Sequence, residues 1–124
     1  MKALVVDDSR VTRVMLGRIL TELGCSFEQA ANGQEGLSVL NEHGPFDLVL
    51  VDWNMPVMNG IDFVTAVRKD QRFAGVPIVM VTSEIEVDYM TRALSAGANE
   101  YIMKPFERES VESKLKLVSP TVGA

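Results

Sequence analysis

The sequence predicts an α/β domain in which a five-stranded parallel sheet lies between two layers of helices. Two apolar runs, residues 46–51 and 76–81, have the β-branched composition of strands that are covered on both faces. Strand candidates alternate with helix candidates along the chain, and the loops between them are short. Alternation of this kind produces right-handed crossovers with helices on both faces of the sheet, which is a doubly wound fold flanked by five helices.

The first half of the chain contains three strand candidates. A short buried strand over residues 3–6 is followed by a helix that Ser9 caps and Gly24 ends. A weaker strand over residues 26–30 precedes a helix that opens at Asn32 and ends before Pro45. The run 46–51 is the third strand. Apolar residues recur at helical spacing in the two helices: Leu16, Ile19, Leu20 and Leu23, then Leu37 and Leu40.

The second half contains two further strands. A third helix begins at Asn59-Gly60, and the run 76–81 forms a strand in which Pro77 is tolerated at the first position. A fourth helix is predicted over residues 84–96, with Gly97 as its cap, before a last strand over 101–103. A fifth helix runs from Glu107 to Ser119. The apolar faces of these helices are Phe63, Val64 and Val67, then Val87, Met90 and Leu94, then Val111, Leu115 and Val118.

Size and composition predict one domain over residues 1–120, with a frayed tail over 121–124. The chain has 124 residues, of which 47% are hydrophobic and 6% aromatic, so we expect an aliphatic core. A net charge of -5 argues against nucleic acid as a partner. Cys25 is the only cysteine and excludes an internal disulfide. No segment is long enough for a signal peptide or a membrane span, and we expect a cytoplasmic, soluble monomer without a membrane partner.

Four polar endings follow the predicted strands. They are Asp7-Asp8, Asp52, Thr82 and Lys104. Because parallel strands end at the same edge of a sheet, these side chains are expected to meet there. Clustered carboxylates repel one another, and Lys104 together with Mg²⁺ would offset that repulsion. Such a set suits phosphoryl transfer, with Asp52 as nucleophile and with Thr82 and Lys104 as phosphate ligands.

The chain resembles the receiver domain of bacterial two-component response regulators in the order and placement of five features. These are Asp7, Asp8, Asp52, Thr82 and the pair Lys104-Pro105. The resemblance implies the strand order 2-1-3-4-5. It also implies that a histidine kinase phosphorylates Asp52. Mg²⁺ would be held by Asp8, Asp52 and the backbone carbonyl of Asn54, with Asp7 assisting through water.

The resemblance further implies a switch made of Thr82 and Tyr101. The hydroxyl would move onto the phosphoryl group and the aromatic ring would turn inward, which remodels the face formed by the fourth helix, fifth strand and fifth helix. Asn54 and Glu84 resemble residues that tune dephosphorylation, and the Lys104-Pro105 bond is expected to be cis. On general grounds alone, Asp7-Asp8 is more often a helix cap and Tyr101 a packing residue.

Within the family, the stretch from Asp52 to Pro56, together with Glu84 and Tyr101, resembles the chemotaxis regulator. We therefore expect a signalling switch and not an enzyme, although it catalyses its own phosphorylation and dephosphorylation. Its target would be a protein, such as a flagellar motor switch.

Three alternatives remain at this stage. The first is a phosphorelay intermediate or phosphate sink. The second is a phosphatase of the haloacid dehalogenase type, against which Asn54 argues because an amide cannot act as the general acid. The third is a flavodoxin-like cofactor binder, which would need a glycine-rich phosphate loop after the first strand.

Overall fold

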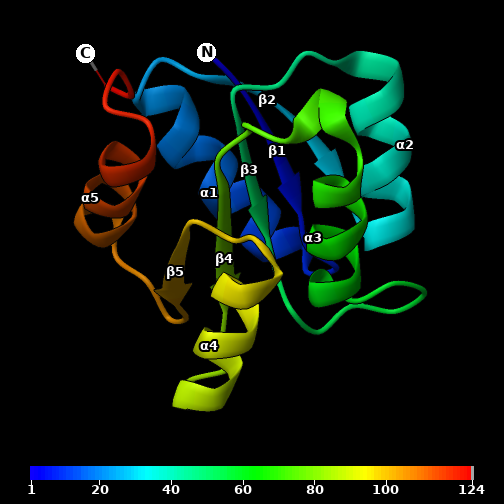
Figure 1. Ribbon diagram of the computed structural model, residues 1–124. Coiled ribbons are helices and arrows are strands. Elements are labelled where there is room, and N and C mark those ends of the chain that lie inside the picture. Colours follow the sequence, from blue (N-terminus) through cyan, green and yellow to red (C-terminus); the bar gives the residue numbers. More distant parts are fainter. Residues whose placement is uncertain (124) are drawn as a thin grey trace.

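A computed structural model describes residues 1–123 and contains the predicted five-stranded parallel sheet (Figure 1). The spatial order is β2-β1-β3-β4-β5, and every neighbouring pair of strands is parallel, which confirms the predicted topology. The strands are β1 (Lys2–Val6), β2 (Ser26–Ala30), β3 (Leu48–Val51), β4 (Ile78–Thr82) and β5 (Glu100–Met103).

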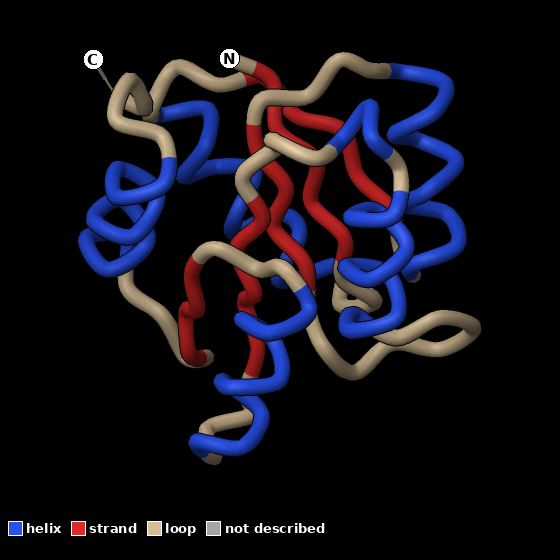
Figure 2. Tube along the Cα trace, viewed as in Figure 1, coloured by secondary structure: helices blue, strands red, loops and turns tan. Residues whose placement is uncertain are grey.

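Helices cover both faces of the sheet (Figures 1 and 2). The helices are α1 (Arg10–Glu22), α2 (Gly33–His43), α3 (Gly60–Lys69), α4 (Val87–Ala96) and α5 (Arg108–Val118), with a short 3₁₀ helix η1 (Gln71–Phe73) after α3. Helices α1 and α5 pack on one face, and α2, α3 and α4 pack on the other. The chain therefore has the doubly wound architecture.

The core is divided between the two faces by the alternation of side chains along each strand. In β1, Ala3 and Val5 join the cluster under α1 and α5, whereas Leu4 and Val6 join the cluster under α2, α3 and α4. All four are fully buried. Burial on both faces explains why the strands are apolar runs and not alternating ones.

Three helices begin with side-chain caps at the sequence positions expected to cap them. Ser9, Asn32 and Asn59 each accept a hydrogen bond from the backbone N–H three residues on, at the starts of α1, α2 and α3. These starts follow the carboxyl ends of β1, β2 and β3. The caps therefore fix the loops that carry the candidate site.

Helix α4 differs from the prediction in its start and in its buried face. It begins at Val87 and not at Glu84, because the Glu84 carbonyl accepts the Tyr101 hydroxyl and does not enter the helical hydrogen-bond pattern. Val87 and Leu94, predicted on its apolar face, are 76% and 51% exposed, and Ala93 is its buried residue. Gly97 does end the helix, at a φ of 120° that disfavours residues with a side chain.

The tail also differs from the prediction as far as the described residues extend. Val122, within the segment 121–124 expected to fray, is buried at 1% exposure and packs in the cluster beneath α1 and α5. Its N–H donates to the carbonyl of Ser119. Ala124 lies outside the described residues. Within residues 1–123, none of the helices combines the length and the apolar character needed to cross a bilayer.

Candidate functional site

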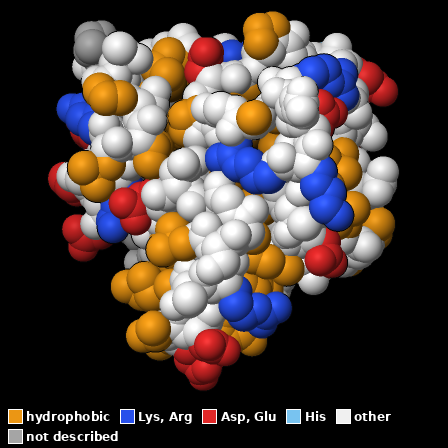
Figure 3. All heavy atoms as spheres, viewed as in Figure 1, with side chains coloured by type: hydrophobic (Ala, Val, Ile, Leu, Met, Phe, Trp, Pro, Cys, Tyr) orange, Lys and Arg blue, Asp and Glu red, His pale blue; other side chains and the backbone are white. Residues whose placement is uncertain are grey.

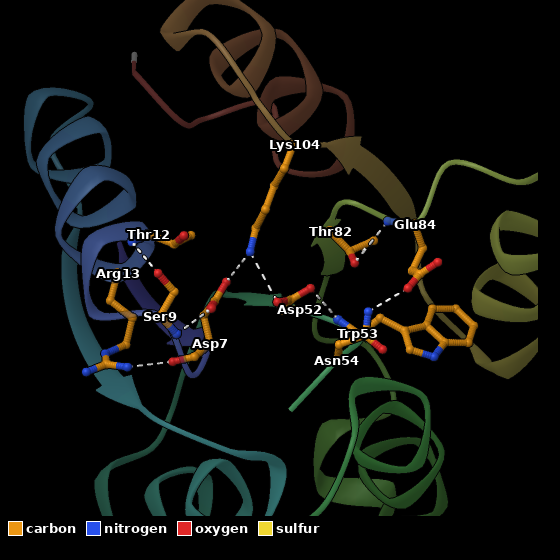
Figure 4. A network of polar contacts seen from close by, with 10 residues as sticks. All are labelled: Asp7, Ser9, Thr12, Arg13, Asp52, Trp53, Asn54, Thr82, Glu84 and Lys104. Carbon is orange, nitrogen blue, oxygen red and sulfur yellow. Dashed lines mark hydrogen bonds and ion pairs between the residues drawn. The ribbon is translucent and has the colours of Figure 1, made fainter. Parts of the chain in front are cut away.

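The carboxyl ends of four strands bring the candidate residues together at one edge of the sheet (Figure 4). Asp7 follows β1, Asp52 follows β3, Thr82 is the last residue of β4 and Lys104 follows β5. Asp7, Asp52 and Thr82 are buried, with 1%, 7% and 0% exposure. Residues far apart in the sequence therefore form one polar site in an otherwise apolar core.

Lys104 lies between the two buried carboxylates. Its Nζ is 2.9 Å from Asp7 Oδ2 and 3.1 Å from Asp52 Oδ2. Burial alone lowers the pKa of a lysine, but hydrogen bonds and attraction from both carboxylates outweigh it, and the pKa of Lys104 is raised. Lys104 therefore stays positively charged. The Lys104-Pro105 peptide bond is cis, as expected.

Asp7 is held in place by hydrogen bonds, but its negative charge is destabilised by burial and by the nearby Asp52. Its Oδ1 accepts the Ser9 N–H at 2.8 Å, and its backbone carbonyl accepts Arg13 Nη1 at 2.6 Å. Burial raises the pKa of Asp7, the nearby charge of Asp52 adds to the effect, and the hydrogen bonds from Lys104 and Ser9 oppose it. Two carboxylates and one lysine thus leave excess negative charge at this edge.

The acidic residues fit a small divalent cation. One carboxylate oxygen from each of Asp7, Asp8 and Asp52 lies within 4.8 Å of the others. The donors are all oxygen, and Asp8 is exposed, so water can complete the coordination. Such a donor set favours Mg²⁺ over metals that prefer nitrogen or sulfur. A pocket beside Asp8 is lined by Trp53, Asn54, Met55 and Asn59.

The loop between β3 and α3 packs closely against Asp52. The Trp53 N–H donates to Asp52 Oδ1 at 2.7 Å, and the Trp53 carbonyl accepts the Gly60 N–H at 2.8 Å. A Cβ at Gly60 would lie 2.0 Å from the Asp52 carbonyl oxygen, so this position requires glycine. Val57 in the same loop has a φ of 69°, which is strained for a β-branched residue.

Glu84 connects this loop to the end of β4. Its Oε1 accepts Asn54 Nδ2 at 2.5 Å, and its N–H donates to Thr82 Oγ1 at 3.4 Å. The Tyr101 hydroxyl donates to the Glu84 carbonyl, and the Tyr101 ring lies inward at 4% exposure. Burial raises the pKa of Tyr101 to about 12, and the charges of Glu84 and Asp52 contribute.

Sequence reasoning missed several residues that shape the site. Ser9 was expected only as a cap, although its N–H also holds Asp7. Arg13 and Gly60 gave no signal beyond ordinary helix positions, and Tyr89 and Arg92 of α4 pack against Trp53. A sequence shows helical spacing between positions 89 and 92, but not that this side of the helix faces Trp53.

Comparison with known proteins decides which family shares this arrangement. The sequence profile of the response regulator receiver domain matches residues 3–116. The chain belongs to the receiver domain family of response regulators. The match favours this family over the dehalogenase-type phosphatase and the flavodoxin-like cofactor binder.

Chemotaxis proteins are among the relatives of this receiver domain. The chain is 41% identical to chemotaxis protein CheY1 of Helicobacter pylori over 122 residues, covering 98% of each chain. It is 38% identical to chemotaxis protein CheY of Pseudomonas aeruginosa over 125 residues, covering 99% of each. The crystal structure of Vibrio cholerae CheY4 superimposes with a TM-score of 0.89 at 37% identity, covering 94% of this chain and 97% of that one. The protein is a signalling switch of the CheY-like response regulator type.

Proposed function

We propose that Asp52 is the phosphoacceptor of a chemotaxis response regulator and receives its phosphoryl group from a histidine kinase. One observation carries the proposal: Lys104 bridges Asp7 and Asp52 beside three converging carboxylate oxygens. A phosphoryl group on Asp52 would meet the lysine and the metal position together. Phosphoryl transfer depends mainly on such positioning and charge neutralisation.

The residues of the chain divide the work of the transfer. The Trp53 N–H donates a hydrogen bond to Asp52 Oδ1 and keeps the carboxylate in one orientation. An oxygen of the Asp52 carboxylate then attacks the phosphorus of the phosphohistidine. The phosphorus–nitrogen bond breaks, and the imidazole leaves with its electron pair. Asp7, Asp8, Asp52 and the Asn54 carbonyl would hold Mg²⁺, which would supply positive charge for the phosphoryl oxygens. Lys104, already 3.1 Å from Asp52, adds its own positive charge.

The same site is proposed to govern the lifetime of the phosphoryl group. The side chains of Asn54, which is exposed, and Glu84, which is half-buried, are hydrogen-bonded to each other close to Asp52 (Figure 4). Asn54 also lines the pocket beside Asp8, from which a water can approach the acyl phosphate. We therefore assign to Asn54 and Glu84 the tuning of self-catalysed dephosphorylation.

The output is proposed to pass through Thr82 and Tyr101 to the face formed by α4, β5 and α5. Thr82 moves onto the phosphoryl group, and the inward Tyr101 ring supports the remodelled face. Figure 3 shows hydrophobic side chains gathered along α4 and beside β5, where Val87, Leu94 and Met103 are exposed. Exposed apolar residues on one face suit a protein target. Phosphorylation shifts the population between two arrangements of this face.

The proposal is tested with a small phosphodonor and Mg²⁺, followed by intact mass and by Trp53 fluorescence. The wild type is expected to gain one labile phosphoryl group, and Asp52→Ala to gain none. Asp47→Ala, which removes an acid outside the site, is the control and should label like the wild type. A wild type that stays unlabelled, or an Asp52→Ala protein that is labelled, contradicts the proposal.

The identity of the output requires a second measurement. The phosphorylated protein is expected to capture a flagellar motor switch component in a pull-down, and the Asp52→Ala protein is not. Transfer of the phosphoryl group to a second histidine protein would instead indicate a phosphorelay intermediate.

A further inference from the structure

Trp53, the residue that follows Asp52, is held by two side chains of α4. The Trp53 and Tyr89 rings meet edge to face, with centroids 4.8 Å apart and planes at 78°. The guanidinium carbon of Arg92 lies 5.2 Å from the centre of the Trp53 ring and 5.8 Å from that of Tyr89. Residues 89 and 92 are neighbours on one side of the helix. We call Tyr89, Arg92 and Trp53 the tryptophan clamp.

The clamp is connected to Asp52 through the Trp53 backbone. The Trp53 N–H donates to Asp52 Oδ1 at 2.7 Å, and the Trp53 carbonyl accepts the Gly60 N–H at 2.8 Å. The ring itself is buried at 5% exposure. A displacement of the ring therefore disturbs the hydrogen bond that orients the carboxylate.

Helix α4 has few other anchors. Ala93 is its buried residue, whereas α1 and α3 bury four residues each. Its N-cap, Glu86, makes no side-chain hydrogen bond to the helix. A helix with so little buried surface moves at low cost, so a single cluster on it can decide its position.

A second contact, besides the clamp, joins the residues after Asp52 to the region of α4. Glu84 accepts a hydrogen bond from Asn54 through its side chain and another from the Tyr101 hydroxyl through its carbonyl. The residues after Asp52 and the residues before α4 are thus joined at two places while Tyr101 lies inward. The clamp belongs to this arrangement.

We propose that Tyr89 and Arg92 are positioning residues that act through Trp53. They stabilise the position that α4 has when the Tyr101 ring lies inward. In this way they raise the affinity of the Asp52 site for a phosphoryl group. The inference rests on the proposed function of Asp52. Coupling of this kind is reciprocal: whatever the clamp adds to phosphoryl binding, phosphoryl binding adds to the placement of α4.

The test measures binding of beryllium fluoride, a phosphoryl mimic, in the presence of Mg²⁺ by calorimetry. Arg92→Ala is expected to weaken binding by about threefold, the effect of one cation–π contact at an exposed site. Alanine preserves the helix, since its helix propensity exceeds that of arginine. Tyr89→Leu removes the edge-to-face ring contact and should weaken binding to a similar extent. Thr91→Ala, exposed on the same helix, is the matched control and should bind like the wild type.

Arg92→Lys separates the clamp from a simple effect of charge. Lysine keeps the positive charge but lacks the planar guanidinium that lies over the two rings. Weakened binding by both Arg92→Lys and Arg92→Ala supports the clamp, and wild-type binding by Arg92→Lys overturns it. In the unliganded protein, Arg92→Ala should shift Trp53 emission toward that of an exposed indole.

A merely structural role gives a different result. In that case the urea midpoint of Arg92→Ala falls while its affinity for beryllium fluoride stays at the wild-type value. That outcome overturns the clamp and leaves the proposed function of Asp52 intact. A wild-type protein that does not bind beryllium fluoride at all overturns the proposed function of Asp52 and, with it, the clamp.

Discussion

Asp52→Asn is expected to stabilise the metal-free protein although it removes an ion pair with Lys104. The Asp52 carboxylate lies within 4.8 Å of Asp7 and of Asp8, and 3.1 Å from Lys104 Nζ. At an effective dielectric constant of about 20, each repulsion is worth roughly 3 kcal/mol and the attraction roughly 5 kcal/mol. Because Asp8 is exposed, solvent screens its share. The screened repulsions and the attraction therefore nearly cancel, and relief from the desolvation cost of the buried Asp52 carboxylate leaves a net gain of about 1 kcal/mol.

The gain is measured as the free energy of unfolding in urea, in the presence of a chelator. In a chain of this size it corresponds to a rise of roughly 4 °C in the melting temperature. Asparagine keeps an oxygen that can accept the Trp53 N–H, so the loop after β3 stays closed. Glu42→Gln, which removes one negative charge from an exposed position on α2, controls for the change in net charge and should leave stability unchanged.

In the presence of Mg²⁺, the wild type is expected to become more stable than Asp52→Asn. At a concentration one hundred times its dissociation constant, a ligand stabilises the folded state by about 2.7 kcal/mol. The wild type gains that amount, whereas Asp52→Asn lacks one carboxylate ligand and gains less. A metal-free Asp52→Asn protein less stable than the wild type, or equal stabilisation of both by Mg²⁺, would refute the argument from charge repulsion.

Three further outcomes follow from local geometry. Gly60→Ala should lower the free energy of unfolding by about 3 kcal/mol, because its Cβ would clash with the Asp52 carbonyl. Gly75→Ala, whose Cβ would lie in open space, should leave stability unchanged. Urea unfolding of both variants checks the difference. Val57→Gly should raise stability by about 1 kcal/mol in the same assay, since it relieves a positive φ. The pKa of Tyr101 is raised from 10.0 to about 12, so the stability it contributes is present below pH 10 and is lost as the pH rises toward 12. Tyr101→Phe should remove that part of the alkaline loss, and equal slopes for both proteins would contradict it.

The sequence was sufficient to predict the sheet and the residues at its edge. Buried parallel strands are apolar on both faces, so each polar residue at a strand end stands out, as Asp52 does after 48–51. Once the strands are known to be parallel, Asp7, Thr82 and Lys104 must come to the same edge. Pattern and topology together therefore carry most of the information about the site.

Helix α4 and the tail were predicted less well, for a physical reason. Helical periodicity shows that Val87 and Leu94 lie on one side of α4, but it does not show whether other elements cover that side. Both are exposed, and the clamp residues Tyr89 and Arg92 lie against Trp53 instead. Val122 follows a proline and looks like part of a loose end, yet a space beneath α1 and α5 accepts it. Such outcomes depend on packing between distant segments.

The uneven distribution of stability in the molecule bears on how the switch works. Asp7, Asp8 and Asp52 crowd negative charge at the sheet edge, and Lys104 offsets only part of it, so a cation or a bridging ligand relieves the remaining repulsion. Helix α4 packs against Trp53 and has the fewest buried residues of the five α-helices in the described part of the chain. We therefore expect a ligand at Asp52 to shift the population of α4 and to leave the well-buried helices α1 and α3 in place, provided that it binds the two arrangements of α4 with different affinities.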